Sequence, residues 1–149
     1  MKLQDLEVGH VFEFSPDEGG SIKALAVKCR CSHGSETQAI FRIREYASAP
    51  RSMNVRSVGK IEEISNSVVQ GQRFSIILDD AEVGSVCDTL FCDRGKILKT
   101  SVESKSGNVM VAILDTPWVI NGDITVKDLG YSGDYAPIKK RRQRKKKAE

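Results

Sequence analysis

The sequence predicts a mainly β fold: a small antiparallel barrel or sandwich, one short helix, and a disordered basic tail at the C-terminus. Short stretches of alternating apolar and polar residues recur along the chain, separated by clusters of turn-forming residues. Only one segment has the spacing of an amphipathic helix, too few for a sheet built from βαβ units. A chain of 149 residues suits one domain. We therefore assign residues 1–129 to a β-rich globular domain and residues 130–149 to a flexible linker and Lys/Arg-rich tail.

The first half of the chain predicts a strand followed by a hairpin. The three strands are expected at residues 8–14, 21–31 and 38–46. The loop between the second and third has a length common in hairpins. In the third strand Ala39, Phe41 and Ile43 should face inward, which places Arg42 and Arg44 on the outer face.

One segment has helical spacing. Val83, Val86, Cys87, Leu90 and Phe91 would share one face of a helix. Asp79 is a suitable N-cap, with Glu82 three residues later, and Gly95 is a suitable stop. The sequence therefore predicts a helix over about residues 79–94, although Gly84 and Thr89 leave a strand as the alternative.

The remaining strands are expected at residues 53–64, 73–78, 96–104 and 108–115, and residues 119–126 are expected to hold one more strand pair around the turn Asn121-Gly122-Asp123. The run Val109–Leu114 is apolar on both faces, as in a central strand covered on two sides. Thr116-Pro117-Trp118 indicates a turn after it. No internal repeat at a fixed period is evident.

Charge is concentrated at the C-terminus. The formal net charge is +3, but residues 139–149 hold eight basic residues and one acid, a balance of +7. Residues 1–138 therefore carry −4. A basic arm on an acidic body is typical of a folded module that binds a polyanion.

The tail is the main candidate for nucleic-acid binding, because each phosphate that a cation neutralises releases condensed counterions. Its candidate contacts are Lys139, Lys140, Arg141, Arg142, Arg144, Lys145, Lys146 and Lys147. The run KKRRQRKKK resembles the arginine-rich arm of lentiviral transactivator proteins, which implies RNA binding, and is similar to monopartite nuclear-localisation signals. The tail alone leaves DNA and RNA as equal alternatives.

Arg42 and Arg44 are the candidates for nucleic-acid contacts from the body, with Tyr46, Tyr131 and Tyr135 as possible stacking residues. The other aromatic side chains fit core positions. They are Phe12, Phe14, Phe41, Phe74, Phe91 and Trp118.

The four cysteines offer a weaker hypothesis. Cys29, Cys31, Cys87 and Cys92 could supply the four ligands of a zinc ion. Their C-x-C and C-x4-C spacings differ from tight zinc knuckles, and the apolar positions around them favour buried thiols. We therefore expect no metal and no other cofactor.

Catalysis has little support, since the two histidines, His10 and His33, stand apart from any recognisable catalytic motif. The function expected is non-catalytic nucleic-acid binding. The alternative is a viral or phage structural or assembly protein whose arm contacts packaged genome, because the opening LxxLxVGxxFxF is similar to the starts of small phage β proteins. Expected partners are nucleic acid and, for assembly, further copies of the chain, with no membrane. The expected location is intracellular: cytoplasmic, nuclear in a eukaryote, or in the virion.

Overall fold

Two long strands form the centre of the molecule. The computed structural model describes residues 1–16, 22–30, 37–64, 74–89 and 95–137. Its nine strands make one antiparallel sheet in the order β5-β4-β6-β7-β8-β3-β2-β1-β9, with β3 and β8 at the middle. The strands are β1 (His10–Phe14), β2 (Ala24–Cys29), β3 (Thr37–Ala49), β4 (Asn54–Lys60), β5 (Phe74–Ile77), β6 (Ser85–Thr89), β7 (Gly95–Glu103), β8 (Val109–Asn121) and β9 (Lys127–Tyr131). Three short 3₁₀ turns accompany them, η1 (Leu3–Asp5), η2 (Ile61–Glu63) and η3 (Leu78–Asp80).

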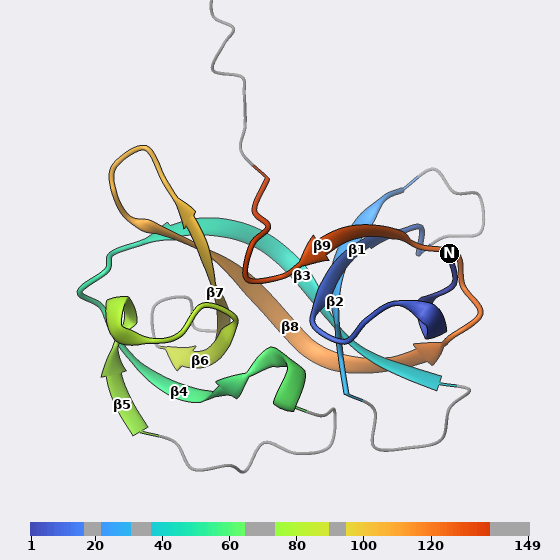
Figure 1. Ribbon diagram of the computed structural model, residues 1–149, viewed down its shortest axis with the longest axis horizontal. Coiled ribbons are helices and arrows are strands. Elements are labelled where there is room, and N and C mark those ends of the chain that lie inside the picture. Colours follow the sequence, from blue (N-terminus) through green and yellow to red (C-terminus); the bar gives the residue numbers. More distant parts are fainter. Residues whose placement is uncertain (17–21, 31–36, 65–73, 90–94, 138–149) are drawn as a thin grey trace, which may run out of the picture.

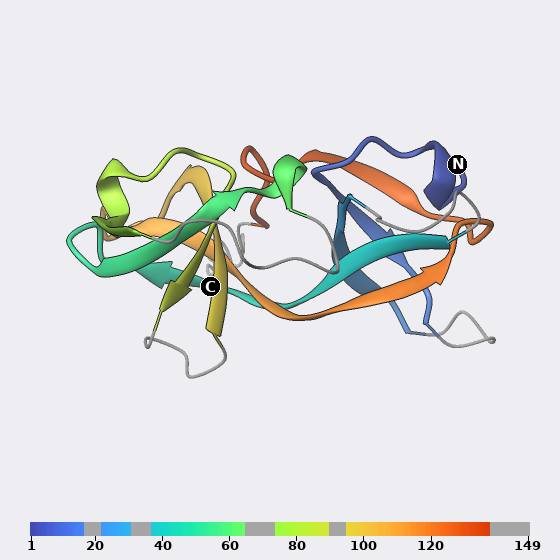
Figure 2. The same ribbon diagram turned by 90° about the horizontal axis from the view of Figure 1, so that it is seen from below.

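The sheet curls into two lobes on either side of the central pair (Figure 1). The first lobe contains η1, β1, β2 and β9, with the start of β3 and the end of β8. The second lobe contains η3, β4, β5, β6 and β7, with the end of β3 and the start of β8. Figure 2 shows β3 and β8 as a continuous bridge between the lobes, with η2 lying over the middle.

The two halves of the chain repeat one structural unit, residues 3–64 and 78–135. The first unit begins LxDxEVGxV from Leu3, and the second begins LxDxEVGxV from Leu78, 75 positions later. In both units a glycine with positive φ follows, Gly9 at 93° and Gly84 at 91°. Its N–H donates to a lysine carbonyl oxygen, that of Lys28 (2.7 Å) or Lys99 (2.8 Å). The repeat is therefore present in sequence, geometry and hydrogen bonding.

The same two lysines brace the 3₁₀ turns. The Lys28 ammonium donates to the carbonyl oxygens of Leu3 (2.9 Å) and Leu6. The Lys99 ammonium donates to the carbonyl oxygens of Asp79 (3.1 Å) and Ala81 (2.6 Å). Burial is the main cause that lowers the pKa of each lysine. Each lobe thus uses a buried lysine ammonium to donate hydrogen bonds to carbonyl oxygens in and just after its 3₁₀ turn.

The units exchange their last strands. The strand β4 of the first unit pairs with β6 of the second, and β9 of the second unit pairs with β1 of the first. The exchanged strands share a sequence pattern, VRSVG ending at Gly59 and VKDLG ending at Gly130, 71 positions apart. Both pairings shift register near these glycines. Because of this exchange, each lobe contains strands from both units, so neither lobe is formed by a contiguous stretch of the chain.

The cores of the lobes correspond position by position. The first-lobe residues compared are six buried core residues and the partly buried Ile120, in the order Leu3, Leu6, Phe12, Ala26, Ile40, Ile120 and Val126. Their counterparts in the second lobe, in the same order, are Leu78, Ala81, Cys87, Ile97, Val111, Ala49 and Val55. A third cluster joins the lobes, and it contains the equivalent pairs Val27 with Leu98 and Phe41 with Ala112.

The expectation of no repeat is thus wrong. The offset between the units is 75 residues before the first hairpin loop and 71 after it, because nine residues separate β1 from β2 whereas five separate β6 from β7. A search at one fixed period misses such a repeat.

The mainly β class is confirmed, but a closed barrel is wrong, because the sheet order ends at β5 and β9 and these strands are not paired with each other in the described chain. The helix over residues 79–94 is also wrong. Asp79 lies in η3, residues 85–89 form β6, and residues 90–94 lie outside the described residues. Val86 packs in the central cluster and Cys87 in the second-lobe core. A strand covered on both faces has consecutive apolar residues, which imitate a helical pattern.

The turn expected at residues 116–118 is wrong as well, since β8 continues through Pro117, which lies opposite Phe41 of β3. The pairing shifts register beside this position, and a proline is tolerated at such an irregularity. The central, doubly covered strand over Val109–Leu114 is confirmed: its residues are buried except Met110, and successive ones pack in different clusters. The hairpins β2–β3 and β7–β8 are confirmed too.

Candidate nucleic-acid interface

A basic groove crosses the middle of β3. It has a volume of about 1010 Å³ and is lined by residues of β2, β3, the β7–β8 hairpin and the chain near residue 137. Its cations are Lys23, Arg42, Arg44 and Lys105, and its acids are Glu45 and Glu103. The body of the protein is acidic as a whole, so this local excess of two positive charges distinguishes the groove from the average surface.

The groove lies at the root of the basic tail. Pro137, the last described residue before the tail, lines it together with Arg42 and Arg44. The approach to Pro137 is held in place, because Ser101 N–H donates to the Gly133 carbonyl oxygen (2.6 Å) and Tyr135 packs edge-on against Tyr46 with 6.2 Å between ring centroids. The segment expected as linker is therefore attached to the fold as far as Tyr135. The eight tail cations, Lys139 to Lys147, lie outside the described residues.

Tyr46 forms part of the groove wall. It packs partly against the central cluster, and burial raises its pKa, so the phenol stays neutral over the physiological range. Tyr46, with Tyr135 packed edge-on against it, therefore places an aromatic side chain beside the groove cations. Tyr131 is different. Its hydroxyl donates to Glu62 (2.8 Å) and its ring packs on the central cluster, so its contacts are those of a structural residue.

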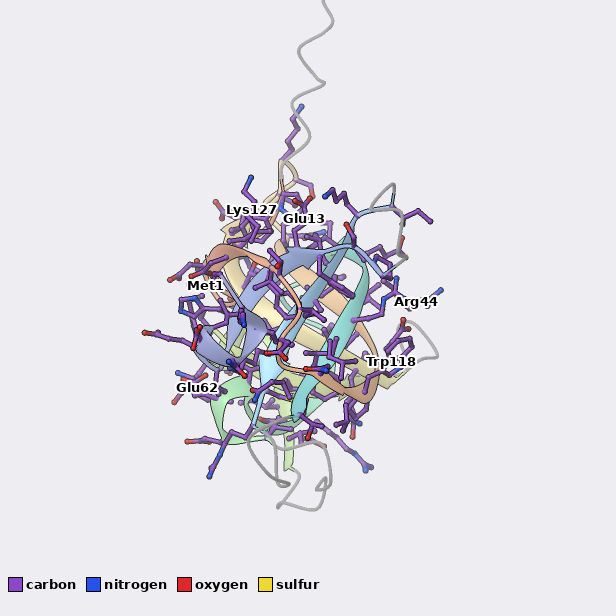
Figure 3. All side chains as sticks on the ribbon, turned by 90° about the vertical axis from the view of Figure 1, so that its right-hand side faces the viewer. Met1, Glu13, Arg44, Glu62, Trp118 and Lys127 are labelled. Carbon is purple, nitrogen blue, oxygen red and sulfur yellow. The ribbon has the colours of Figure 1, made fainter. Side chains whose placement is uncertain are left out.

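Arg42 and Arg44 both have a partner in the fold. The Arg44 Nε atom lies 3.5 Å from an oxygen of Asp115, an exposed pair of modest strength. The guanidinium of Arg42 lies 5.6 Å from the centroid of the Trp118 ring. Figure 3 shows Arg44 and Trp118 on the same side of the first lobe. When a planar guanidinium stacks on an indole, the ring covers one face of the guanidinium, while the N–H donors at its edge stay available to a phosphate.

Trp118 is exposed rather than in the core. Its exposed fraction is 46%, whereas its cross-strand partner Ile40 is fully buried. The expectation of a core position is wrong, and the indole belongs to none of the three hydrophobic clusters. Phe12, Phe14 and Phe41 are buried as expected, while nothing is described of the side chains of Phe74 and Phe91.

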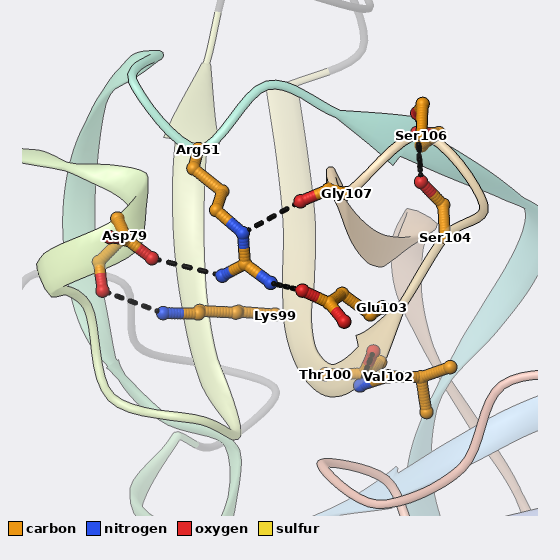
Figure 4. A network of polar contacts seen from close by, with 10 residues as sticks. Arg51, Asp79, Lys99, Thr100, Val102, Glu103, Ser104, Ser106 and Gly107 are labelled. Carbon is orange, nitrogen blue, oxygen red and sulfur yellow. Dashed lines mark hydrogen bonds and ion pairs between the residues drawn. The ribbon is translucent and has the colours of Figure 1, made fainter.

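An arginine network holds the β7–β8 hairpin (Figure 4), whose residues Glu103, Ser104 and Lys105 line part of the groove. Arg51 donates to the Gly107 carbonyl oxygen (2.8 Å), to Asp79 (3.0 Å) and to Glu103 (3.0 Å). These bonds connect the turn after β3 with η3 and the hairpin. They also occupy Glu103, so one of the two groove acids is already neutralised by a neighbour.

The cysteines are not brought together as far as the structure describes them. Cys29 is buried in the central cluster and Cys87 in the second-lobe core. Burial is the main cause that raises the pKa of the Cys87 thiol to about 11, which suits a protonated, unreactive side chain. Cys31 and Cys92 lie outside the described residues. Among the residues that are described, no group of three or more potential metal ligands occurs.

His10 is held by carboxylates. Its Nδ1 atom lies 3.0 Å from Asp128 and its Nε2 atom 3.3 Å from Glu7. The hydrogen bond with His10 is the main cause that lowers the pKa of Asp128. The pair joins β1 to β9 and does not line the groove. His33 lies outside the described residues.

Comparison with known proteins returns no match among protein-family models, curated proteins or solved structures. Within the described ranges, no helix has the length and apolar character needed to cross a membrane.

Proposed function

We propose that this protein binds nucleic acid without catalysing a reaction on it, with the tail and the basic groove acting as one continuous surface. The observation that carries the proposal is the position of Pro137. Pro137, two positions before the first of the eight tail cations, lines the same groove as Lys23, Arg42, Arg44 and Lys105. A phosphate chain lying along the groove would meet the tail without crossing the acidic remainder of the body.

The tail supplies affinity and the groove supplies position. Neutralising about eight phosphates gives a log–log salt slope on the order of −5 to −7, so binding weakens steeply as salt rises. The groove cations are fixed by the sheet, and fixed phosphate contacts set the register and orientation of a nucleic acid. The proposal leaves DNA and RNA as outcomes of the test.

The experiment measures binding to single-stranded DNA, duplex DNA and RNA as a function of salt, for the full chain and for residues 1–137. Removal of the tail should take away most of the affinity. It should also reduce the magnitude of the log–log salt slope to roughly 2 or less, because few phosphate contacts remain. A truncated protein that binds as tightly as the full chain would overturn the proposal.

A matched pair of variants tests the groove. Arg42→Gln with Arg44→Gln removes two cations from the groove, and Arg56→Gln with Lys127→Gln removes two exposed cations outside it. Both double variants have the same net charge. The groove variant should bind more weakly than its control at every salt concentration, whereas equal losses would show that only net charge matters. If residues 1–137 sediment as a large assembly in the absence of nucleic acid, the assembly-protein alternative applies instead.

A further inference from the structure

We infer that Trp118 and Arg42 form a base-stacking site that makes the groove selective for single-stranded nucleic acid, an inference that rests on the proposed function. The indole is nearly half exposed. Its neighbour Arg42 belongs both to the cation–π pair and to the groove lining. The site is therefore continuous with the surface proposed to hold phosphates.

The internal repeat shows that this site is not required by the fold. In the second unit, Arg42 corresponds to Ile113, which is 3% exposed in the second-lobe core. In the first unit, Trp118 corresponds to Ala47, which packs against that same core. The second lobe covers its sheet at these positions and has small or aliphatic residues there, Ala47 and Ile113. The first lobe has an exposed indole and a cation there instead.

The chemistry of the pair suits an unpaired base. An exposed indole face accepts any base by stacking, and the adjacent guanidinium can reach the phosphate that follows. A duplex keeps its bases stacked on each other, so it offers phosphates to the groove but no base face to Trp118. The pair therefore adds affinity for single strands and little for duplexes.

Trp118 is the only tryptophan in the chain, so its fluorescence reports on this site alone. Titration of the full chain with a single strand of roughly a dozen thymidines should quench the fluorescence, because a stacked base quenches an indole. A duplex with the same number of phosphates should bind through the tail with much smaller quenching.

Substitution of Trp118 measures how much the indole contributes to the affinity for single strands. Trp118→Leu should weaken single-strand binding by about tenfold and duplex binding by less than about twofold. Its salt slope should stay unchanged, because no phosphate contact is lost. Trp118→Phe should recover part of the loss, and Ile77→Ala, which truncates an exposed side chain of the second lobe, should have no effect.

The outcomes separate the two proposals. If the full chain binds none of the nucleic acids, the proposed function fails and the stacking site with it. If it binds with the expected salt dependence but shows no quenching, or if Trp118→Leu weakens single-strand and duplex binding equally, the stacking site is overturned and the proposed function stands.

Discussion

The two lobes are built on the same plan, and one of the differences between their surfaces lies beside the groove. Both have a 3₁₀ turn braced by a buried lysine, a glycine with positive φ, and a final strand donated by the other unit. They differ at Arg42 and Trp118, whose equivalents Ile113 and Ala47 pack in or against the second-lobe core. The positions that agree carry the fold. Arg42 and Trp118 are free of that requirement, and we interpret them as part of the binding surface.

The lobes also differ inside their cores, and there the differences compensate. Phe12 and Ala26 are cross-strand partners in the first lobe, and Cys87 and Ile97 are cross-strand partners at the equivalent place in the second. One lobe puts the large side chain on its first strand, the other on its second. Volume is conserved in the pair rather than at each position, as close-packed interiors require.

The largest expected effect comes from breaking this compensation. Phe12→Cys should lower the free energy of unfolding by about 3 to 4 kcal/mol, because it leaves a cavity beside Ala26. Adding Ala26→Ile should restore part of the loss, since the first lobe then has the pair of the second. Urea denaturation of the single and double variants measures the coupling. Additive losses would contradict the equivalence of the two cores.

The two equivalent glycines should respond unequally. A Cβ at Gly84 would lie 2.3 Å from the Tyr131 hydroxyl, whereas a Cβ at Gly9 would lie 3.2 Å from the Tyr131 ring. Gly84→Ala should therefore cost about 3 kcal/mol and Gly9→Ala about 2 kcal/mol of unfolding free energy. Gly107→Ala, with positive φ and no atom within 4 Å, is the control for backbone strain alone and should cost about 1 kcal/mol. Equal costs at all three glycines would contradict the role of Tyr131.

The two buried lysines should respond equally. Lys28→Met and Lys99→Met each leave carbonyl groups of a 3₁₀ turn without their donor. Each should lower the free energy of unfolding by about 2 kcal/mol, the cost of unsatisfied buried acceptors. The measurement is the urea midpoint of each variant. A large loss at one lysine with none at the other would contradict the parallel between the lobes.

The smallest expected effect is on the pH dependence of the unfolding free energy, and it comes from His10 and Asp128 in the first lobe. The pKa of Asp128 is lowered in the fold by its hydrogen bond with His10, so its stabilisation is present above the ordinary carboxyl pKa and disappears as pH falls through the folded value. Because the side chain is 36% exposed, Asp128→Asn should remove less than about 1 kcal/mol near neutral pH.

The same variant should make no difference to stability at a pH below the folded pKa of Asp128, where the carboxyl group is protonated. The equivalent positions in the second lobe are Ser57 and Ser85, which do not titrate. Ser57→Ala should therefore leave the pH dependence of the unfolding free energy unchanged, and an equal change in both variants would contradict the assignment to His10 and Asp128.

The sequence predicts the elements whose pattern is local. Alternation identifies β3 and places Arg42 and Arg44 outside the core, and turn residues identify the β7–β8 hairpin. The helix over 79–94 fails because β6 is covered on both faces, which removes the alternation that marks a strand.

The rest depends on contacts between distant residues. The exchange of β4 and β9 places Gly59 beside Val86 and Gly130 beside Val11, and nothing in the local sequence indicates those partners. The repeat itself was detectable, since LxDxEVGxV occurs twice. The exposure of Trp118 was not detectable from the sequence, because it depends on which residues of distant strands pack around the indole. Comparing Trp118 with Ala47 becomes possible only once the register between the units is known.

The account rests on where a nucleic acid touches the protein, and amide and indole chemical shifts report that directly. Titration of the isotopically labelled full chain with a single-stranded oligonucleotide should perturb Lys23, Arg42–Tyr46, Lys105 and the indole N–H of Trp118, together with the tail. Perturbations concentrated on η3 and β5 of the second lobe, or confined to the tail, would contradict a binding surface in the groove.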